Sequence, residues 1–220
     1  MQKFDLCTFA AVVFLVLVIT GWCRVCPAAS HTYLQIQEDG KLFFDWRLVE
    51  QEGQVRIVSS NDAVRYVNVC LPTGETLEWK MKGPEVDIRA VRHGRSLVIQ
   101  GTRQGKAYEH KQAVGELPWR QPLSFSLRPL LDGKRTDCRF WMIHPESLKV
   151  HKLFAESGPS ESVSIKGREY AARRIDVSLN RWTRSFWKAS YWFRASDGLF
   201  LRFEGRDGVF GDPIQIKLVD

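Results

Sequence analysis

The residues that could do chemistry are scattered along this chain. The five histidines stand at positions 31, 93, 110, 144 and 151, and there is no G-x-S-x-G, H-E-x-x-H, P-loop or G-x-G-x-x-G motif. Glu109 and His110 are neighbours on a predicted strand, so their side chains point to opposite faces of the sheet. We therefore expect no catalytic site and no cofactor, and a hydrolase ranks behind the binding functions considered below.

Metal ligation is not expected either. His144 and His151 are seven residues apart with Pro145 between them, which is not the spacing of two ligands on one helix face. Asp176 and Glu204 lie on predicted strands close to arginines, a pattern typical of surface ion pairs across strands.

Length and composition narrow the class of protein. The chain has 220 residues, of which 44% are hydrophobic and 26% charged. This balance is enough for one sizeable core, and it excludes both a disordered chain and a polytopic membrane protein. The formal net charge of +7 favours binding to an anionic partner.

The first thirty residues look like a secretory leader. An apolar run of eleven residues occupies 9–19, and small residues follow at 27–30. Eleven residues are too few to span a bilayer as a helix, but they fit the apolar region of a signal peptide. We expect cleavage near 28–31 and a periplasmic or secreted protein, with an uncleaved membrane anchor as the minor alternative. Export argues against nucleic acid as a partner.

Removal of the leader would leave two cysteines, Cys70 and Cys138. An even pair in an exported protein indicates one disulfide, and the alternative is two separate buried thiols. The spacing in the sequence does not decide between them, because a bridge needs Cα atoms within about 7 Å.

From residue 31 onward the chain alternates apolar and polar residues with a period of two. Leu42, Phe44, Trp46 and Leu48 form one such face, and turn pairs such as Gln104-Gly105 and Lys166-Gly167 separate the runs. This pattern predicts about ten to twelve strands joined by short hairpin turns, hence an antiparallel sheet in one domain over 31–220. The proline-rich segment 115–134 predicts one or two helical turns at 123–128, and a second short helix could form near 145–148.

A large sheet with few helices must bury its apolar face by curling on itself or by stacking on a second sheet. A curled sheet can enclose a cavity, and aromatic side chains would then line it for an apolar ligand; plain core packing is the alternative. The large side chains expected on the inner face are Phe44, Trp46, Trp79, Trp187, Tyr191, Phe193 and Phe203.

Three stretches carry a resemblance to known proteins: 138–144 (CRFWMIH), 167–176 (GREYAARRID) and 190–204 (SYWFRASDGLFLRFE). Together they resemble an uncharacterised family of exported bacterial β-proteins, similar in architecture to the outer-membrane lipoprotein carrier and insertase group. The resemblance covers roughly 110–205. It implies a mainly β fold, a single highly twisted antiparallel half-barrel whose concave side accepts acyl chains under a lid of one or two short helices. The lid would be 115–134, with Trp119, Leu123, Phe125 and Leu127 facing the concavity.

The segment 161–194 is locally basic and supports a second hypothesis. Arg173, Arg174, Arg181 and Arg184 could attract an anionic membrane surface or an envelope protein, or they could be a solvated outer face. The sequence therefore supports two hypotheses of function. The first is a carrier that shelters a lipid or acyl chain, and the second is a non-catalytic envelope interaction protein with a filled core and a basic partner-binding face.

Overall fold

The fold is one large antiparallel sheet. A computed structural model describes residues 28–179, 187–206 and 211–219. Residues 1–27, which hold most of the predicted leader, lie outside the described residues, as do Arg181 and Arg184. Within the described residues, fourteen strands form one sheet in the order β8-β7-β6-β5-β4-β3-β2-β1-β14-β13-β12-β11-β10-β9. The strands are β1 (Ala29–Gln37), β2 (Gly40–Gln51), β3 (Gln54–Ser60), β4 (Arg65–Cys70), β5 (Thr76–Gly83), β6 (Val86–His93), β7 (Ser96–Arg103), β8 (Lys106–Ala113), β9 (Asp137–Ile143), β10 (Val150–Ile165), β11 (Arg168–Ser178), β12 (Lys188–Arg194), β13 (Phe200–Arg206) and β14 (Pro213–Leu218).

Short turns join most of these strands to their neighbours along the chain, as the sequence predicts. At Gln104-Gly105 and Lys166-Gly167 both residues have positive φ, between 50° and 76°. Two consecutive residues of positive φ form the hairpin turn whose twist matches that of the flanking strands, and glycine adopts this φ without steric cost. One long-range pairing, between β1 and β14, joins the two ends of the described chain and makes the sheet continuous.

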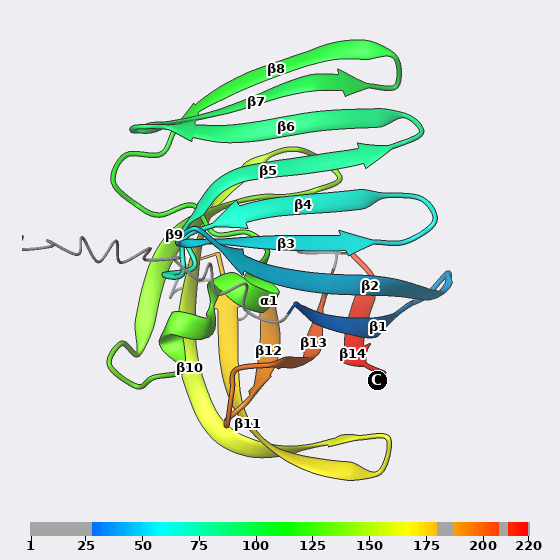
Figure 1. Cartoon of the computed structure of the whole chain (residues 1–220), viewed down its shortest axis with the longest axis vertical. Coiled ribbons are helices and arrows are strands. Elements are labelled where there is room, and N and C mark those ends of the chain that lie inside the picture. Colours follow the sequence, from blue (N-terminus) through cyan, green and yellow to red (C-terminus); the bar gives the residue numbers. More distant parts are fainter. Residues whose placement is uncertain (1–27, 180–186, 207–210, 220) are drawn as a thin grey trace, which may run out of the picture.

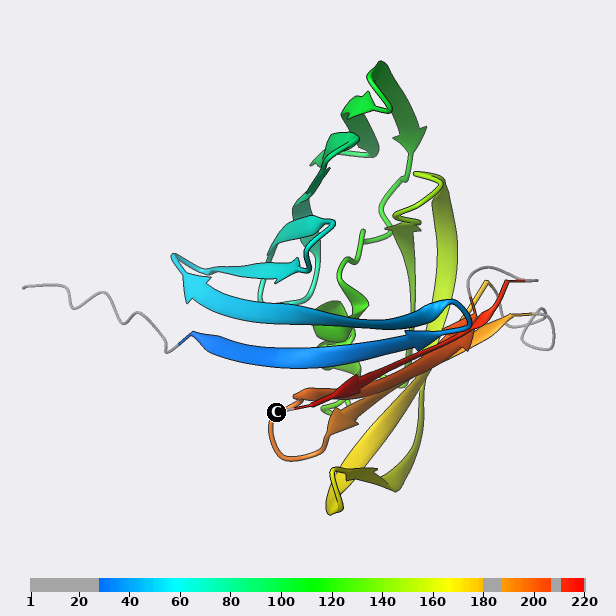
Figure 2. The ribbon, with the colours of Figure 1, turned by 90° about the vertical axis from the view of Figure 1, so that its right-hand side faces the viewer.

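The sheet is strongly bent and not closed. Figure 2 shows its two halves turned toward each other, with the connection between β8 and β9 running between them. That connection holds α1 (Leu123–Ser126) and the 3-10 turn η1 (Arg128–Leu130). The predicted fold class, an open antiparallel half-barrel with one or two short helices, is therefore confirmed.

The connection bridges the two halves by backbone hydrogen bonds. Trp141 N on β9 donates to Pro118 O at 2.8 Å, and Arg120 N donates back to Trp141 O at 3.0 Å. On the other side, Thr76 N of β5 donates to Trp119 O at 2.7 Å. The segment is thus held against both halves from the inside of the bend (Figure 1).

The residues expected to face the concavity are buried inside the bend. Leu123, Phe125 and Leu127 are buried in the larger of two hydrophobic clusters, and Trp119 in the smaller one. We call the segment 115–134 the plug, because it packs between the two halves of the bent sheet. The reason is composition: its large apolar side chains find their burial between the two sheet halves, which no other helix covers within the described residues.

Across the part of the chain that the structure describes, we find no helix with the length and apolar character needed to cross a membrane.

Candidate functional site

A cavity of about 630 Å³ lies on the concave side of the sheet. Its walls come from strands at both ends of the chain, from the plug and from the β9–β10 turn. Rings and aliphatic side chains dominate the lining, which includes Tyr33, Phe44, Trp46, Tyr66, Trp79, Leu123, Met142, Ile143, Leu153, Leu179, Trp187, Tyr191, Phe200, Phe203, Ile214 and Ile216. A pocket of this size with mostly apolar walls is typical of sites for small apolar ligands.

Strand pairing places the rings side by side. Tyr33 on β1 pairs with Phe44 on β2, and their rings stack with centroids 5.5 Å apart. Tyr191 on β12 pairs with Phe203 on β13, with centroids 4.9 Å apart. Because directly paired residues in an antiparallel sheet share a face, each pair presents two rings to the same space.

Six of the nine aromatic residues predicted to bind a ligand line this cavity: Phe44, Trp46, Trp79, Trp187, Tyr191 and Phe203. The other three do not. A β-bulge between Trp192 and Phe193 disturbs the register with β13, and Phe193 packs 5.9 Å from Phe200, which lines the cavity. Trp119 and Phe125 are core residues of the plug.

Sequence reasoning missed several lining residues. Tyr33 pairs directly with Phe44, so the alternation of β1 is consistent with its place in the lining. Phe200 is three residues from Phe203, and strict alternation would put it on the other face; the register shift between β12 and β13 brings it to the cavity. His144 and His151 also line the cavity, with ring centroids 6.3 Å apart, because the β9–β10 turn brings them together. Among the described residues, no cluster of three or more His, Cys, Asp or Glu side chains could hold a metal ion.

Burial shifts the pKa of three groups on the cavity wall, Tyr66, His151 and Tyr191, toward the uncharged form. Burial raises the pKa of Tyr191, and burial followed by the Glu146 carboxylate raises the pKa of Tyr66. Burial, then His144 and Lys149, lowers the pKa of His151. The charged lining residues Glu146 and Arg206 are both exposed to solvent. The interior of the cavity is therefore suited to an uncharged or apolar group.

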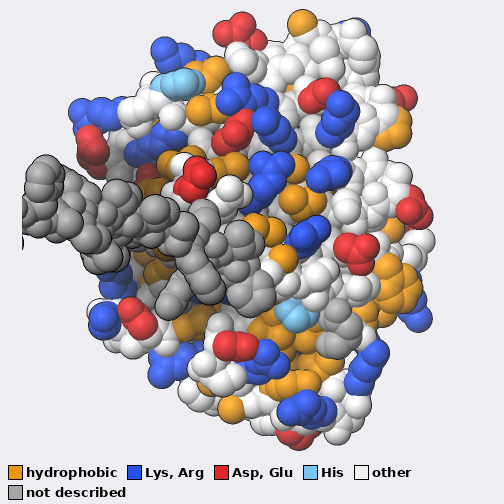
Figure 3. Space-filling view, in the orientation of Figure 1, with side chains coloured by type: hydrophobic (Ala, Val, Ile, Leu, Met, Phe, Trp, Pro, Cys, Tyr) orange, Lys and Arg blue, Asp and Glu red, His pale blue; other side chains and the backbone are white. Residues whose placement is uncertain are grey.

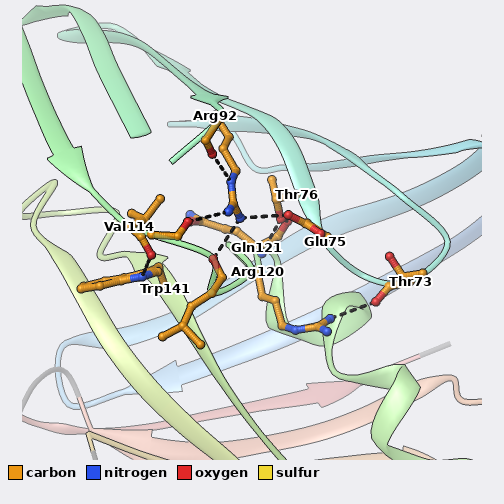
Figure 4. A network of polar contacts seen from close by, with 11 residues as sticks. Thr73, Glu75, Thr76, Arg92, Val114, Arg120, Gln121 and Trp141 are labelled. Atoms are coloured by element: carbon orange, nitrogen blue, oxygen red, sulfur yellow. Dashed lines mark hydrogen bonds and ion pairs between the residues drawn. The ribbon is translucent and has the colours of Figure 1, made fainter. Parts of the chain in front are cut away.

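A polar network joins the plug to strands β5 and β6 (Figure 4). The Arg92 guanidinium donates to Glu75 Oε1 and Leu117 O at 2.9 Å and to Gly115 O at 3.0 Å. Thr76 Oγ1 donates to Gln121 O and accepts from Gln121 N, both at 2.7 Å. These bonds fix the backbone on either side of Trp119, the tryptophan of the connection.

The two cysteines are free thiols, so the predicted disulfide is not formed. Cys70 Sγ donates to Gln121 O at 3.3 Å and lies 3.7 Å from Thr76 Oγ1, while Cys138 is on the distant edge strand β9. Each thiol lies near Arg120 of the plug. Burial raises the pKa of both thiols, and the Arg120 guanidinium opposes this rise. The alternative of two separate thiols is the one observed, with Cys70 buried and Cys138 half-buried.

Burial makes Cys70 a source of pH-dependent stability. Burial raises the pKa of the Cys70 thiol from 9.0 to about 11. Below pH 9 the thiol is neutral in both states, and as the pH rises toward 11 the unfolded state loses its proton first, so stability is lost. We expect this group to remove roughly 2 kcal/mol between pH 8 and pH 11. Urea unfolding of wild type and Cys70→Ala at pH 8 and pH 11 measures this loss of unfolding free energy, since all other groups titrate equally in the two proteins. An equal loss in both would contradict this assignment.

The basic residues of 161–194 are largely engaged in ion pairs. Arg174 contacts Glu161 at 2.6 Å and Asp176 at 3.3 Å, and Lys188 contacts Asp176 at 2.9 Å. Arg173 is half-buried. On the face drawn in Figure 3, basic side chains are interspersed with acidic ones. Arg174 and Lys188 thus belong to one network of ion pairs with Glu161 and Asp176.

Comparison with known proteins adds information at the level of the fold. No protein-family model matches the chain, and no curated protein matches it. Among solved structures, the chain is similar to a beta-barrel-like protein of a domain of unknown function, DUF1849, from Brucella abortus, with a TM-score of 0.56, 10% identity and 88% of this chain and 96% of that chain covered. It also matches the hypothetical lipoprotein YmcC from Escherichia coli, with a TM-score of 0.40, 15% identity and 87% and 83% covered. The first likeness supports a fold shared with uncharacterised bacterial β-proteins.

Proposed function

We propose that this chain is an exported binding or carrier protein that shelters an apolar group, such as a lipid or acyl chain, in the concave cavity. The observation that carries the proposal is the cavity itself: about 630 Å³ bounded by rings from β1, β2, β4, β5, β12 and β13. A bent sheet that only needed a core could have filled this space with side chains, as protein interiors normally do.

Two further features support a carrier rather than an enzyme. Burial raises the pKa of Tyr66 and Tyr191 on the wall, and the charged lining residues Glu146 and Arg206 are exposed. An acyl chain would gain about 0.8 kcal/mol for each methylene that it transfers from water into such a space. The leader-like composition of residues 1–30 supports the part of the proposal that concerns export to the periplasm.

The proposal is tested on the full chain expressed in a bacterial host and purified without detergent. We expect organic extraction followed by mass spectrometry to recover amphiphiles with acyl chains, near one molecule per protein. Delipidated protein should take up the apolar dye N-phenylnaphthylamine and release it when a fatty acid is added. Protein that carries no amphiphile and takes up no dye would overturn the proposal.

A further inference from the structure

Strand β8 ends the sheet with an edge that no other strand covers within the described residues. It is the first strand in the sheet order, and Figure 1 shows it at the top of the view with no element beyond it. The edge at the other end of the order is occupied, because the backbone of Trp141 on β9 is hydrogen-bonded to Pro118 and Arg120 of the plug. An uncovered edge presents unpaired N–H and C=O groups, which are a template for a further strand.

The unpaired backbone groups of this edge belong to alternate residues. The two-residue turn at 104–105 makes the residues that flank it a hydrogen-bonded pair, so the even-numbered residues of β8 direct their backbone groups toward β7. Val114 N, which donates to Arg95 O at 2.9 Å, continues this alternation beyond the strand. Residues 107, 109, 111 and 113 therefore direct their N–H and C=O groups away from the sheet. Across the described part of the chain, the one bond that we find to these groups runs from Gln112 Nε2 to Ala113 O, at 3.1 Å.

The side chains along this edge carry a charge pattern that is complementary to itself. Glu109 and Lys111 share the outer face, where they lie opposite Gln100 and Val98 of β7, and both are exposed. His110 between them is on the inner face, because it pairs with the buried Ile99. An acidic and a basic side chain two residues apart on one face can form two ion pairs with a reversed copy of the same strand.

We propose that a second copy of this chain docks on the β8 edge, with the two β8 strands antiparallel about a two-fold axis at His110. An axis perpendicular to the sheet keeps the outer faces of both copies on the same side, so it must pass through a residue position. With the axis at His110, Glu109 of each copy lies opposite Lys111 of the partner subunit, and the free backbone groups of these residues bond across the axis. With the axis at residue 109 or 111, two like charges would lie opposite each other, which is destabilising. No residue of β8 lines the cavity, so this interface is independent of the proposed carrier function.

Charge reversal tests both the interface and its register. Sedimentation equilibrium over about 1–500 μM should show wild type in a reversible monomer–dimer equilibrium. Glu109→Lys and Lys111→Glu each place like charges opposite one another on both sides of the axis, so either variant alone should dimerise at least about tenfold more weakly. An equimolar mixture of the two variants should form a heterodimer with wild-type affinity, because every lysine at the interface then faces a glutamate. The variant that carries both substitutions should dimerise like wild type.

Asp87→Lys and Lys82→Glu are the matched controls. These two residues form an exposed ion pair of 3.7 Å between β5 and β6, away from the edge, so their reversal should leave dimerisation unchanged. All the substituted side chains are exposed, and each variant should keep the wild-type melting temperature. Wild type that stays monomeric throughout this range, dimerisation that survives both single reversals, or failure of the two variants to associate would overturn the proposal. A heterodimer of Glu109→Lys with wild type but not with Lys111→Glu would place the axis at residue 109 and overturn the register.

Discussion

Replacing Arg92 by methionine is expected to lower the free energy of unfolding by about 2–4 kcal/mol. The Arg92 side chain is 13% exposed and donates to two backbone carbonyls of the connection and to Glu75. Methionine fills a similar volume but leaves these three acceptors without their donor. Since Arg92 joins β6 to the segment that fills the bend, the loss should also loosen the plug.

Arg89→Met is the matched control for this prediction. Arg89 stands three residues earlier on the same strand, but it pairs with Glu78 and its side chain is 51% exposed. Exposed ion pairs contribute about 0–1 kcal/mol, so this variant should unfold nearly like wild type. Urea unfolding of the three proteins measures the difference. Equal stability of both variants would show that the Arg92 network does not hold the plug.

Ser59→Trp is expected to reduce copurified amphiphile at least tenfold with little change in stability. Ser59 lines the cavity between Trp46 and Tyr66, so an indole introduced there projects into space that the fold leaves unfilled. Filling an existing cavity avoids the strain of inserting a large side chain into a packed core. Lipid content by mass spectrometry and dye uptake after delipidation are the measurements.

Ser60→Trp is the control, because adjacent residues on a strand point to opposite faces. Ser60 is absent from the cavity lining and pairs with Asp45 and Arg65, which lie on the outer face. This variant should keep the wild-type lipid content. If both variants carry as much lipid as wild type, the amphiphile is bound elsewhere on the protein.

Much of the fold follows from local rules that a sequence displays. Turn pairs such as Gln104-Gly105 permit the two positive φ values of a tight hairpin, and the period of two between them assigns side chains to faces. Together these features predict sequential antiparallel pairing. They also place Trp187, Tyr191 and Phe203 on the inner face, where the structure has them.

The errors concern pairings and contacts over long distances in the chain. Phe193 alternates correctly with Tyr191, but the bulge beside it cannot be read from one strand alone, since a bulge is a property of two paired strands. The number of cysteines alone indicated a disulfide between Cys70 and Cys138, with two separate thiols as the alternative. Whether the bridge forms depends on how far apart the two strands lie in the bent sheet.

Alternation and turn pairs alone predict an antiparallel β-protein with one aromatic face, because face and hairpin register depend only on neighbouring residues. The open sheet, the position of 115–134 inside its bend and the cavity beside the plug come from contacts between distant segments. Those contacts also leave some buried polar atoms, such as those of Trp46 and Asn68, without a partner among the described residues. Curvature and residual space arise from the sum of packing between segments far apart in the chain, such as β1 and β14, and no local pattern encodes that sum.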